Sequence, residues 1–200
     1  MKIYLLQDPG LYDMYARFSH VGTWSDGGFC SACGEATSNL IEPLQIEWDP
    51  GSDRIGDFSW CGYVAAVTDN VKSSLSSHGF DCEYRKTEVM KPQNIEKYNT
   101  VDYPYKGPAL NWVLPKSSLM LNEKMSRVDL SSDCGECGQK LYTFRREGIV
   151  IDSSQWNGEK IFSIVQFDKT FAIFSTEEGL QEILYFNFTN LGYSECGYIK

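Results

Sequence analysis

Two segments of the chain carry the same succession of apolar runs, turns and helical patterns. In the first segment, apolar runs at 44–49 and 64–68 predict strands on either side of a polar loop. Thr68 is a helix N-cap residue, and apolar residues follow it at helical spacing, which predicts a helix at 69–78. Alternating apolar and polar residues at 80–84 then predict another strand.

The same order returns further along the chain. Apolar runs at 148–152 and 171–175 predict strands, and Ser175 starts a capping box before a helix expected at 176–185. Alternation at 186–188 predicts the closing strand. This repetition suggests an internal duplication. Strand, cap, helix and strand is also a common local order, so chance repetition is the alternative.

Each of the two segments is preceded by a CxxCG motif. The motifs are Cys30-Ser31-Ala32-Cys33-Gly34 and Cys134-Gly135-Glu136-Cys137-Gly138. Each motif places two thiolates at a tight turn, where the glycine permits a positive φ. Two such pairs supply a complete tetrahedral set for one zinc ion and leave no open position for a catalytic water. The expected ion is therefore structural, with Cys30, Cys33, Cys134 and Cys137 as its ligands.

The long gap between the two motifs leaves alternatives open. Residues 34–133 separate them, far more than in a compact zinc ribbon, so dithiol redox chemistry and motifs without metal compete with a shared zinc. Iron also binds four thiolates, although an ordinary cytosol favours zinc. Equivalent motifs of two duplicated halves would meet on a pseudo-twofold axis, which removes the difficulty of distance. Three further cysteines are expected to be small buried hydrophobic residues: Cys61, Cys82 and Cys196.

These patterns predict an α+β protein of two duplicated strand-strand-helix-strand halves with pseudo-twofold symmetry, joined through a zinc-ribbon-like pair of CxxCG turns. The first half, 1–89, includes an N-terminal extension with a strand at 2–6. A connecting segment at 90–127 holds four of the seven prolines and several aromatic residues, so we expect an irregular strap with buried rings. The second half is 128–200, and the three parts are expected to form one compact unit.

Composition and charge narrow the classes of partner. Hydrophobic residues make up 42% of the 200 residues, enough for a sizeable core. The formal charge of −9 argues against nucleic acid and is compatible with a basic protein partner. No apolar run is long enough to span a membrane, and the apolar stretch near the N-terminus is too short for a signal peptide. With seven cysteines and no export signal, we expect a cytoplasmic protein.

The sequence contains none of the common enzyme motifs. It lacks a nucleophile elbow, a phosphate-binding loop, a dinucleotide fingerprint and a zinc-protease helix, so no small-molecule substrate is expected. Acidic residues cluster in two polar loops, where solvated turns, an acid–base pair and a cation site are alternatives. Carboxylates beside tryptophans can also capture basic side chains. We therefore expect partner contacts at Asp49, Asp53, Asp57, Trp60, Asp152, Trp156 and Glu159.

The motifs and the sequences that follow them resemble the bacterial double-CXXCG motif family. The first motif is followed by Ile55-Gly56-Asp57-Phe58-Ser59-Trp60 and the second by Trp156-Asn157-Gly158-Glu159-Lys160-Ile161-Phe162. The family was first noted as myxobacterial paralogues, and several members act as immunity proteins beside polymorphic or contact-delivered toxins. The resemblance, over about residues 25–190, implies a metal bound by the four motif cysteines and no catalytic residue. Members often have proline after the first cysteine of a motif, where this chain has Ser31 and Gly135.

The expectation that unites these features is a cytosolic immunity protein that binds a cognate bacterial toxin stoichiometrically, is not an enzyme and contains one structural zinc. Its toxin would carry a basic surface, complementary to the acidic chain. Two alternatives from other classes remain. One is a hydrolase or transferase whose active site is formed by the acidic loops, and the other is a zinc-stabilised scaffold or adaptor without a toxin partner.

Overall fold

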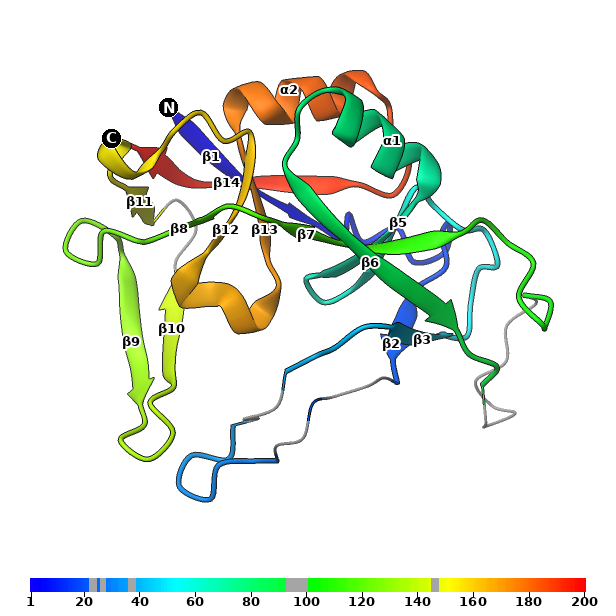
Figure 1. Ribbon diagram of the computed structural model, residues 1–200, viewed down its shortest axis with the longest axis horizontal. Coiled ribbons are helices and arrows are strands. Elements are labelled where there is room, and N and C mark those ends of the chain that lie inside the picture. The colour runs from blue at the N-terminus through cyan, green and yellow to red at the C-terminus, as the bar shows by residue number, and fades with distance from the viewer. Residues whose placement is uncertain (22–24, 26–27, 36–38, 93–100, 145–147) are drawn as a thin grey trace.

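The computed structural model describes residues 1–21, 25, 28–35, 39–92, 101–144 and 148–200 (Figure 1). These residues form two six-stranded sheets, a separate two-stranded hairpin and two α-helices, in agreement with the expected α+β class. Residues 93–100 of the expected connecting segment lie outside the described residues. The first sheet has the order β2 (Phe18–His20), β3 (Leu44–Trp48), β6 (Cys82–Val89), β7 (Leu110–Pro115), β5 (Val64–Thr68) and β4 (Phe58–Cys61).

The second sheet repeats the order and the directions of five strands of the first. Its strands are, in order, β11 (Ile149–Ile151), β14 (Gly192–Ile199), β1 (Lys2–Gln7), β13 (Ile173–Thr176), β12 (Ile161–Ile164) and β8 (Ser118–Leu119). The matching strands are β3, β6, β7, β5 and β4 in the first sheet and β11, β14, β1, β13 and β12 in the second. The first two strands of each set are parallel to each other. Each of the three remaining neighbouring pairs is antiparallel in both sheets.

The central strand of the second sheet comes from a distant part of the chain, whereas that of the first sheet follows β6 directly. β1 lies between β14 and β13 in the second sheet, although it precedes the elements of the first sheet in sequence. β7 lies between β6 and β5 in the first sheet and belongs to the segment 90–127. The expectation of an irregular strap is therefore wrong for 110–115. Proline interrupts regular structure at most positions, but Pro115 is the last residue of its strand, where a missing N–H is tolerated.

Both α-helices begin one residue after a threonine at the end of a strand. α1 (Asp69–Ser77) follows Thr68, as expected, whereas α2 (Glu177–Tyr185) follows Thr176 and not Ser175. The Thr176 hydroxyl accepts a hydrogen bond from the Gly179 N–H at 3.1 Å, which caps the helix. Ser175 is fully buried in β13, where its hydroxyl donates to the Lys160 carbonyl at 2.9 Å.

The strand expected at 186–188 is absent from that place. α2 is followed by a turn in which Asn187 and Asn190 have φ values of 52° and 58°, and β14 begins only at Gly192. Asparagine tolerates this left-handed conformation better than most residues. Alternation of aromatic residues was therefore misleading here, since Phe186 and Phe188 pack against the core from a turn.

Three hydrophobic clusters fill the molecule. The first cluster packs on the first sheet around Trp48 and Trp112, and the second packs on the second sheet around Phe162 and Phe174. The third cluster joins α1 and α2 to residues of both sheets, and it includes Trp60. The two helices lie side by side in Figure 1. Because this third cluster draws residues from both sheets, the two halves share a core.

Polar contacts also cross between the halves. The Asp57 carboxylate accepts hydrogen bonds from the N–H and the hydroxyl of Thr189, both at 2.9 Å. The Asn190 amide donates to the Phe58 carbonyl at 2.8 Å, and the Trp60 indole N–H donates to the Asn190 carbonyl at 2.8 Å. The turn after α2 is thereby fixed onto the edge of the first sheet.

A polar contact from Lys160 also reaches the segment after α1. The carbonyls of Asp57 and Lys160 each accept the N–H of a helix-capping threonine, Thr68 at 3.0 Å and Thr176 at 3.1 Å, so the two residues hold equivalent positions. The Lys160 ammonium donates to the carbonyl of His78, which follows α1, at 3.3 Å. Each half therefore reaches the segment after the other half's helix.

Neither helix is a candidate for a transmembrane segment. Each has nine residues, and none of the described helices reaches the length and apolar character that crossing a bilayer requires.

The burial of β1 predicts that shortening one of its side chains lowers the free energy of unfolding strongly. Ile3→Ala removes a fully buried side chain from the second cluster and should lower the free energy of unfolding by about 2–5 kcal/mol. Leu11→Ala, at a side chain 42% exposed, should change it by no more than about 0.5 kcal/mol. Urea denaturation followed by tryptophan fluorescence measures both. Equal effects would mean that β1 does not complete the second sheet in solution.

Candidate metal centre

The two CxxCG motifs form turns of the same geometry. The Gly34 N–H donates to the Cys30 carbonyl at 2.8 Å, and the Gly138 N–H donates to the Cys134 carbonyl at 2.8 Å. Gly34 and Gly138 have φ values of 77° and 70°, a conformation that other residues adopt only with strain. The glycine in each motif thus closes the turn, as the sequence predicts.

Different parts of the fold present the two turns. The first turn lies in the long connection between β2 and β3. The second lies at the tip of the hairpin formed by β9 (Val128–Asp133) and β10 (Lys140–Phe144). Figure 1 shows the two turns on the same side of the molecule.

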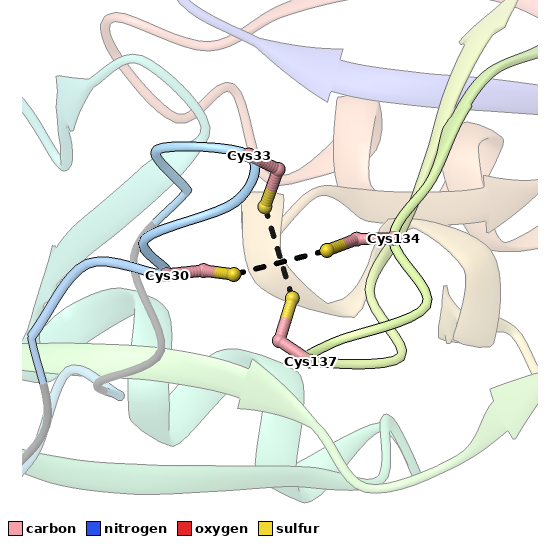
Figure 2. Close-up of side chains that lie close together, drawn as sticks. All are labelled: Cys30, Cys33, Cys134 and Cys137. Atoms are coloured by element: carbon pink, nitrogen blue, oxygen red, sulfur yellow. Dashed lines mark hydrogen bonds between the residues drawn. The ribbon is translucent and has the colours of Figure 1, made fainter.

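The four sulfur atoms of the two turns converge. Cys30 Sγ lies 3.7 Å from Cys134 Sγ, and Cys33 Sγ lies 3.8 Å from Cys137 Sγ. All four lie within 4.8 Å of one another, and Figure 2 shows them pointing toward a common centre. Zinc–sulfur bonds of about 2.3 Å in a tetrahedron give a sulfur–sulfur separation of about 3.8 Å. The four side chains therefore lie close enough together to hold one metal ion.

Burial differs within each pair of cysteines. Cys30 and Cys134, the first cysteine of each turn, are 9% and 8% exposed, whereas Cys33 is half-buried and Cys137 is exposed. The centre is therefore closed on one side and reaches the surface on the other.

The backbone of each turn favours a thiolate at its first cysteine. The N–H groups of Cys33 and Ala32 point at the Cys30 sulfur and lower its pKa to about 6. The N–H groups of Cys137 and Glu136 lower the pKa of Cys134 in the same way.

The second cysteine of each turn behaves differently. The Glu35 N–H lowers the pKa of Cys33, but burial and the three neighbouring thiols outweigh it and raise the pKa to about 12. The pKa of Cys137 is also raised, because burial and the sulfur atoms of Cys134 and Cys30 outweigh the hydrogen bond from the Gln139 N–H. A bound cation would lower the pKa of all four thiols, because it stabilises every thiolate.

The other three cysteines lie away from this centre. Cys82 and Cys196 are buried, at 7% and 2% exposure, and burial raises the pKa of each thiol to about 12. They are the small hydrophobic core residues that the sequence predicts. Cys61 is half-buried at the end of the edge strand β4.

Two of the expected partner contacts have structural roles instead. Trp60 is 1% exposed and stacks on Phe58 in the shared core, so its side chain has no surface to offer a partner. The Asp57 carboxylate is occupied by Thr189, and its other oxygen accepts from the Thr68 hydroxyl at 3.3 Å. The prediction of surface contacts is wrong for Trp60, because a tryptophan beside a glycine-rich loop looks the same in sequence whether it faces inward or outward.

The other expected contacts lie in two loops. Asp49 is half-buried and accepts from the Ser19 hydroxyl at 2.8 Å, and Asp53 is exposed in the same loop. In the loop between β11 and β12, Asp152 accepts from the Asn122 amide at 3.0 Å, and Trp156 donates to the Glu159 carbonyl at 2.9 Å. Contact with a partner at these five positions, Asp49, Asp53, Asp152, Trp156 and Glu159, stays a prediction.

Thr189 and Asn190 are the important residues that sequence reasoning missed. They lie 132 residues from their partners Asp57 and Phe58, in a turn without any recognisable motif. Asn187 and Asn190, which both have positive φ, are asparagines, the residue type that favours such a turn.

Comparison with known proteins adds no relative to this picture. The chain matches no protein-family model, and no curated protein is detectably similar to it in sequence. The metal centre therefore rests on its own geometry.

The geometry predicts a metal content that depends on the four cysteines. Purified protein should contain about one equivalent of a divalent metal, and Cys33→Ser should reduce it to less than about a tenth of that, because a hydroxyl is a poor ligand for a soft site. Cys61→Ser should keep the full equivalent, since Cys61 is not part of the cluster. Elemental analysis after dialysis measures both. Equal metal content in the two variants would contradict the site.

The contacts of Asp57 predict an effect on stability. Asp57→Ala leaves the Thr189 N–H and hydroxyl without their acceptor and should cost about 1–3 kcal/mol of unfolding free energy. Asp81→Ala removes an exposed ion pair with Lys116 and should cost less than about 1 kcal/mol. Chemical denaturation compares the two variants. A cost for Asp57→Ala no greater than for Asp81→Ala would show that this link between the halves adds nothing to stability.

Proposed function

We propose that Cys30, Cys33, Cys134 and Cys137 bind one structural zinc ion. A tetrahedral set of four thiolates is the set that zinc prefers, and the sulfur separations of 3.7 and 3.8 Å support this choice. Four protein ligands leave no coordination position for water or substrate. The ion would therefore join the two turns and take no part in a reaction.

We also infer that the chain is an internal duplication with a pseudo-twofold axis. The matching strand orders support this inference, and so do reciprocal contacts. Tyr63, from the turn before β5, packs on the interior of the second sheet. Phe171, from the turn before β13, packs edge-on against Trp112 in the first, with ring centroids 5.4 Å apart. On this view β1 and β7 are equivalent strands, each placed in the sheet of the other copy.

The function that these features support best is that of a cytoplasmic immunity protein, which neutralises a toxin by stoichiometric binding and is not an enzyme. The observation that carries the proposal is the convergence of the two CxxCG turns, the motif pair that resembles the double-CXXCG family. None of the seven cysteines forms a disulfide, which fits a reducing compartment. The formal charge of −9 favours a toxin with a basic surface.

The acidic loops provide the expected route of encounter with the toxin. Asp53 is exposed, and Glu159 lies in the loop between β11 and β12. Carboxylates at a surface attract a basic partner over several ångströms and raise the rate of association, and this effect weakens with salt. Asp49 and Asp152, whose carboxylates accept hydrogen bonds from neighbouring side chains, would order the same loops.

The proposal predicts a specific complex with the toxin encoded beside the gene of this protein. Cells that express this toxin should survive when they also express the chain. Purified chain with Asp53→Asn and Glu159→Gln should bind the toxin about 3–10 times more slowly at low salt and at nearly the normal rate at high salt. Asp81→Asn removes one charge in another loop and should have a smaller effect than Asp53→Asn alone. Surface plasmon resonance measures the rates.

Two outcomes would reject this function. Absence of both complex and protection would favour a scaffold without a toxin partner. Turnover of a substrate that disappears in the Asp53 and Glu159 variants would favour a hydrolase or transferase with an acidic active site.

A further inference from the structure

The two CxxCG turns lie on segments that we name the arms. The first arm is residues 28–35 and the second arm is residues 129–141. Figure 1 shows both on the same side of the molecule, and Figure 2 shows their cysteines meeting from opposite sides. The rest of the described chain is the body.

The arms contribute almost nothing to the hydrophobic clusters. Among the described residues of both arms, Cys30 and Cys134 are buried, and all the others are half-buried or exposed. Phe29 is 79% exposed and Leu130 is 47% exposed, although they are the large apolar side chains next to the turns. None of the three clusters includes a described residue of either arm. Burial of apolar surface therefore gives the arms little reason to stay together.

Charge opposes the approach of the two arms. The first arm contains one acidic residue and no basic one, and the second contains three acidic residues and one basic, so their formal charges are −1 and −2. Like charges in neighbouring segments repel, and sulfur ligands that are thiolates add to the repulsion. A divalent cation at the centre of the four sulfur atoms offsets this charge directly. The contacts that join the described residues of the arms run through these sulfur atoms.

The body has connections of its own that do not involve the arms. The shared cluster packs α1, α2 and both sheets together, and the Asp57–Thr189 and Lys160–His78 hydrogen bonds join the halves in both directions. Residues on the body side of the arms are also anchored, since Leu40 belongs to the first cluster and Val128 packs on the second. Loss of the contacts at the tips therefore leaves these interactions unchanged.

We propose that the metal acts as a clasp, which closes the two arms on each other without holding the body together. With metal bound, the arms form a single rigid unit. Without metal, the arms separate while the body stays folded. This behaviour differs from that of small zinc domains, which are unfolded without their ion. The inference rests on the proposed metal site and is independent of the toxin.

Hydrogen exchange measured by mass spectrometry tests the clasp. Protein loaded with one equivalent of zinc is compared with protein from which a chelator has removed the metal, as verified by elemental analysis. Amides in peptides covering 28–35 and 130–141 should exchange at least about tenfold faster without metal. Peptides covering 64–75 and 173–183, from the strands and helices of the body, should change by less than about twofold. Far-UV circular dichroism should stay nearly constant.

Variants separate the effect of the metal from that of the chelator. Cys33→Ser alters the half-buried cysteine and should reproduce the fast exchange of the arms without any chelator. Cys61→Ser, at a half-buried cysteine outside the cluster, should exchange like the unaltered protein in its zinc form.

The results that would overturn the clasp differ from those that would overturn the zinc site. If the body exchanges as fast as the arms after metal removal, the metal holds the whole fold and the clasp is wrong. If the arms exchange at the same rate with and without metal, other contacts join them and the clasp is also wrong. A protein that takes up no zinc rejects the metal site and the clasp together.

Discussion

The second sheet depends on a strand supplied from a distant part of the chain. β1 completes the sheet that is otherwise built from strands within residues 118–199, whereas the first sheet is built from the consecutive strands β2 to β7. Because the second sheet without β1 would leave backbone N–H and carbonyl groups of β13 and β14 unpaired, its later strands are not complete alone. The pairing of β1 therefore joins the start of the described chain to its last strands.

Local features such as strands, helix caps and cysteine motifs could be predicted from the sequence, whereas pairing between separate strands could not. The strands at 44–48 and 64–68, the helix after Thr68 and the four clustered cysteines follow from periodicity, capping and spacing, which act over a few residues. The place of 110–115 in the middle of a sheet depends on pairing with β5 and β6, which no local pattern encodes. Prolines around that strand pointed the other way, because their backbone effect is local.

Side-chain orientation was the second limit of the sequence. Trp60 and Asp57 were taken for surface residues because they lie in a stretch rich in glycine, serine and aspartate. The structure buries the indole and gives the carboxylate two donors from Thr189. A carboxylate that joins two halves and one that meets solvent have the same sequence context. Only the turn 132 residues away distinguishes them.

The position of β1 in the second sheet affects folding during synthesis on the ribosome. Its apolar residues, Ile3, Leu5 and Leu6, are synthesised early, but their neighbours β13 and β14 appear only after residue 172. At about 5–20 residues per second, the nascent strand waits on the order of ten seconds or longer before it can pair. During that interval it is an exposed apolar segment, which is the kind of segment that chaperones bind. The pairing of β1 is therefore a late step in the folding of this molecule.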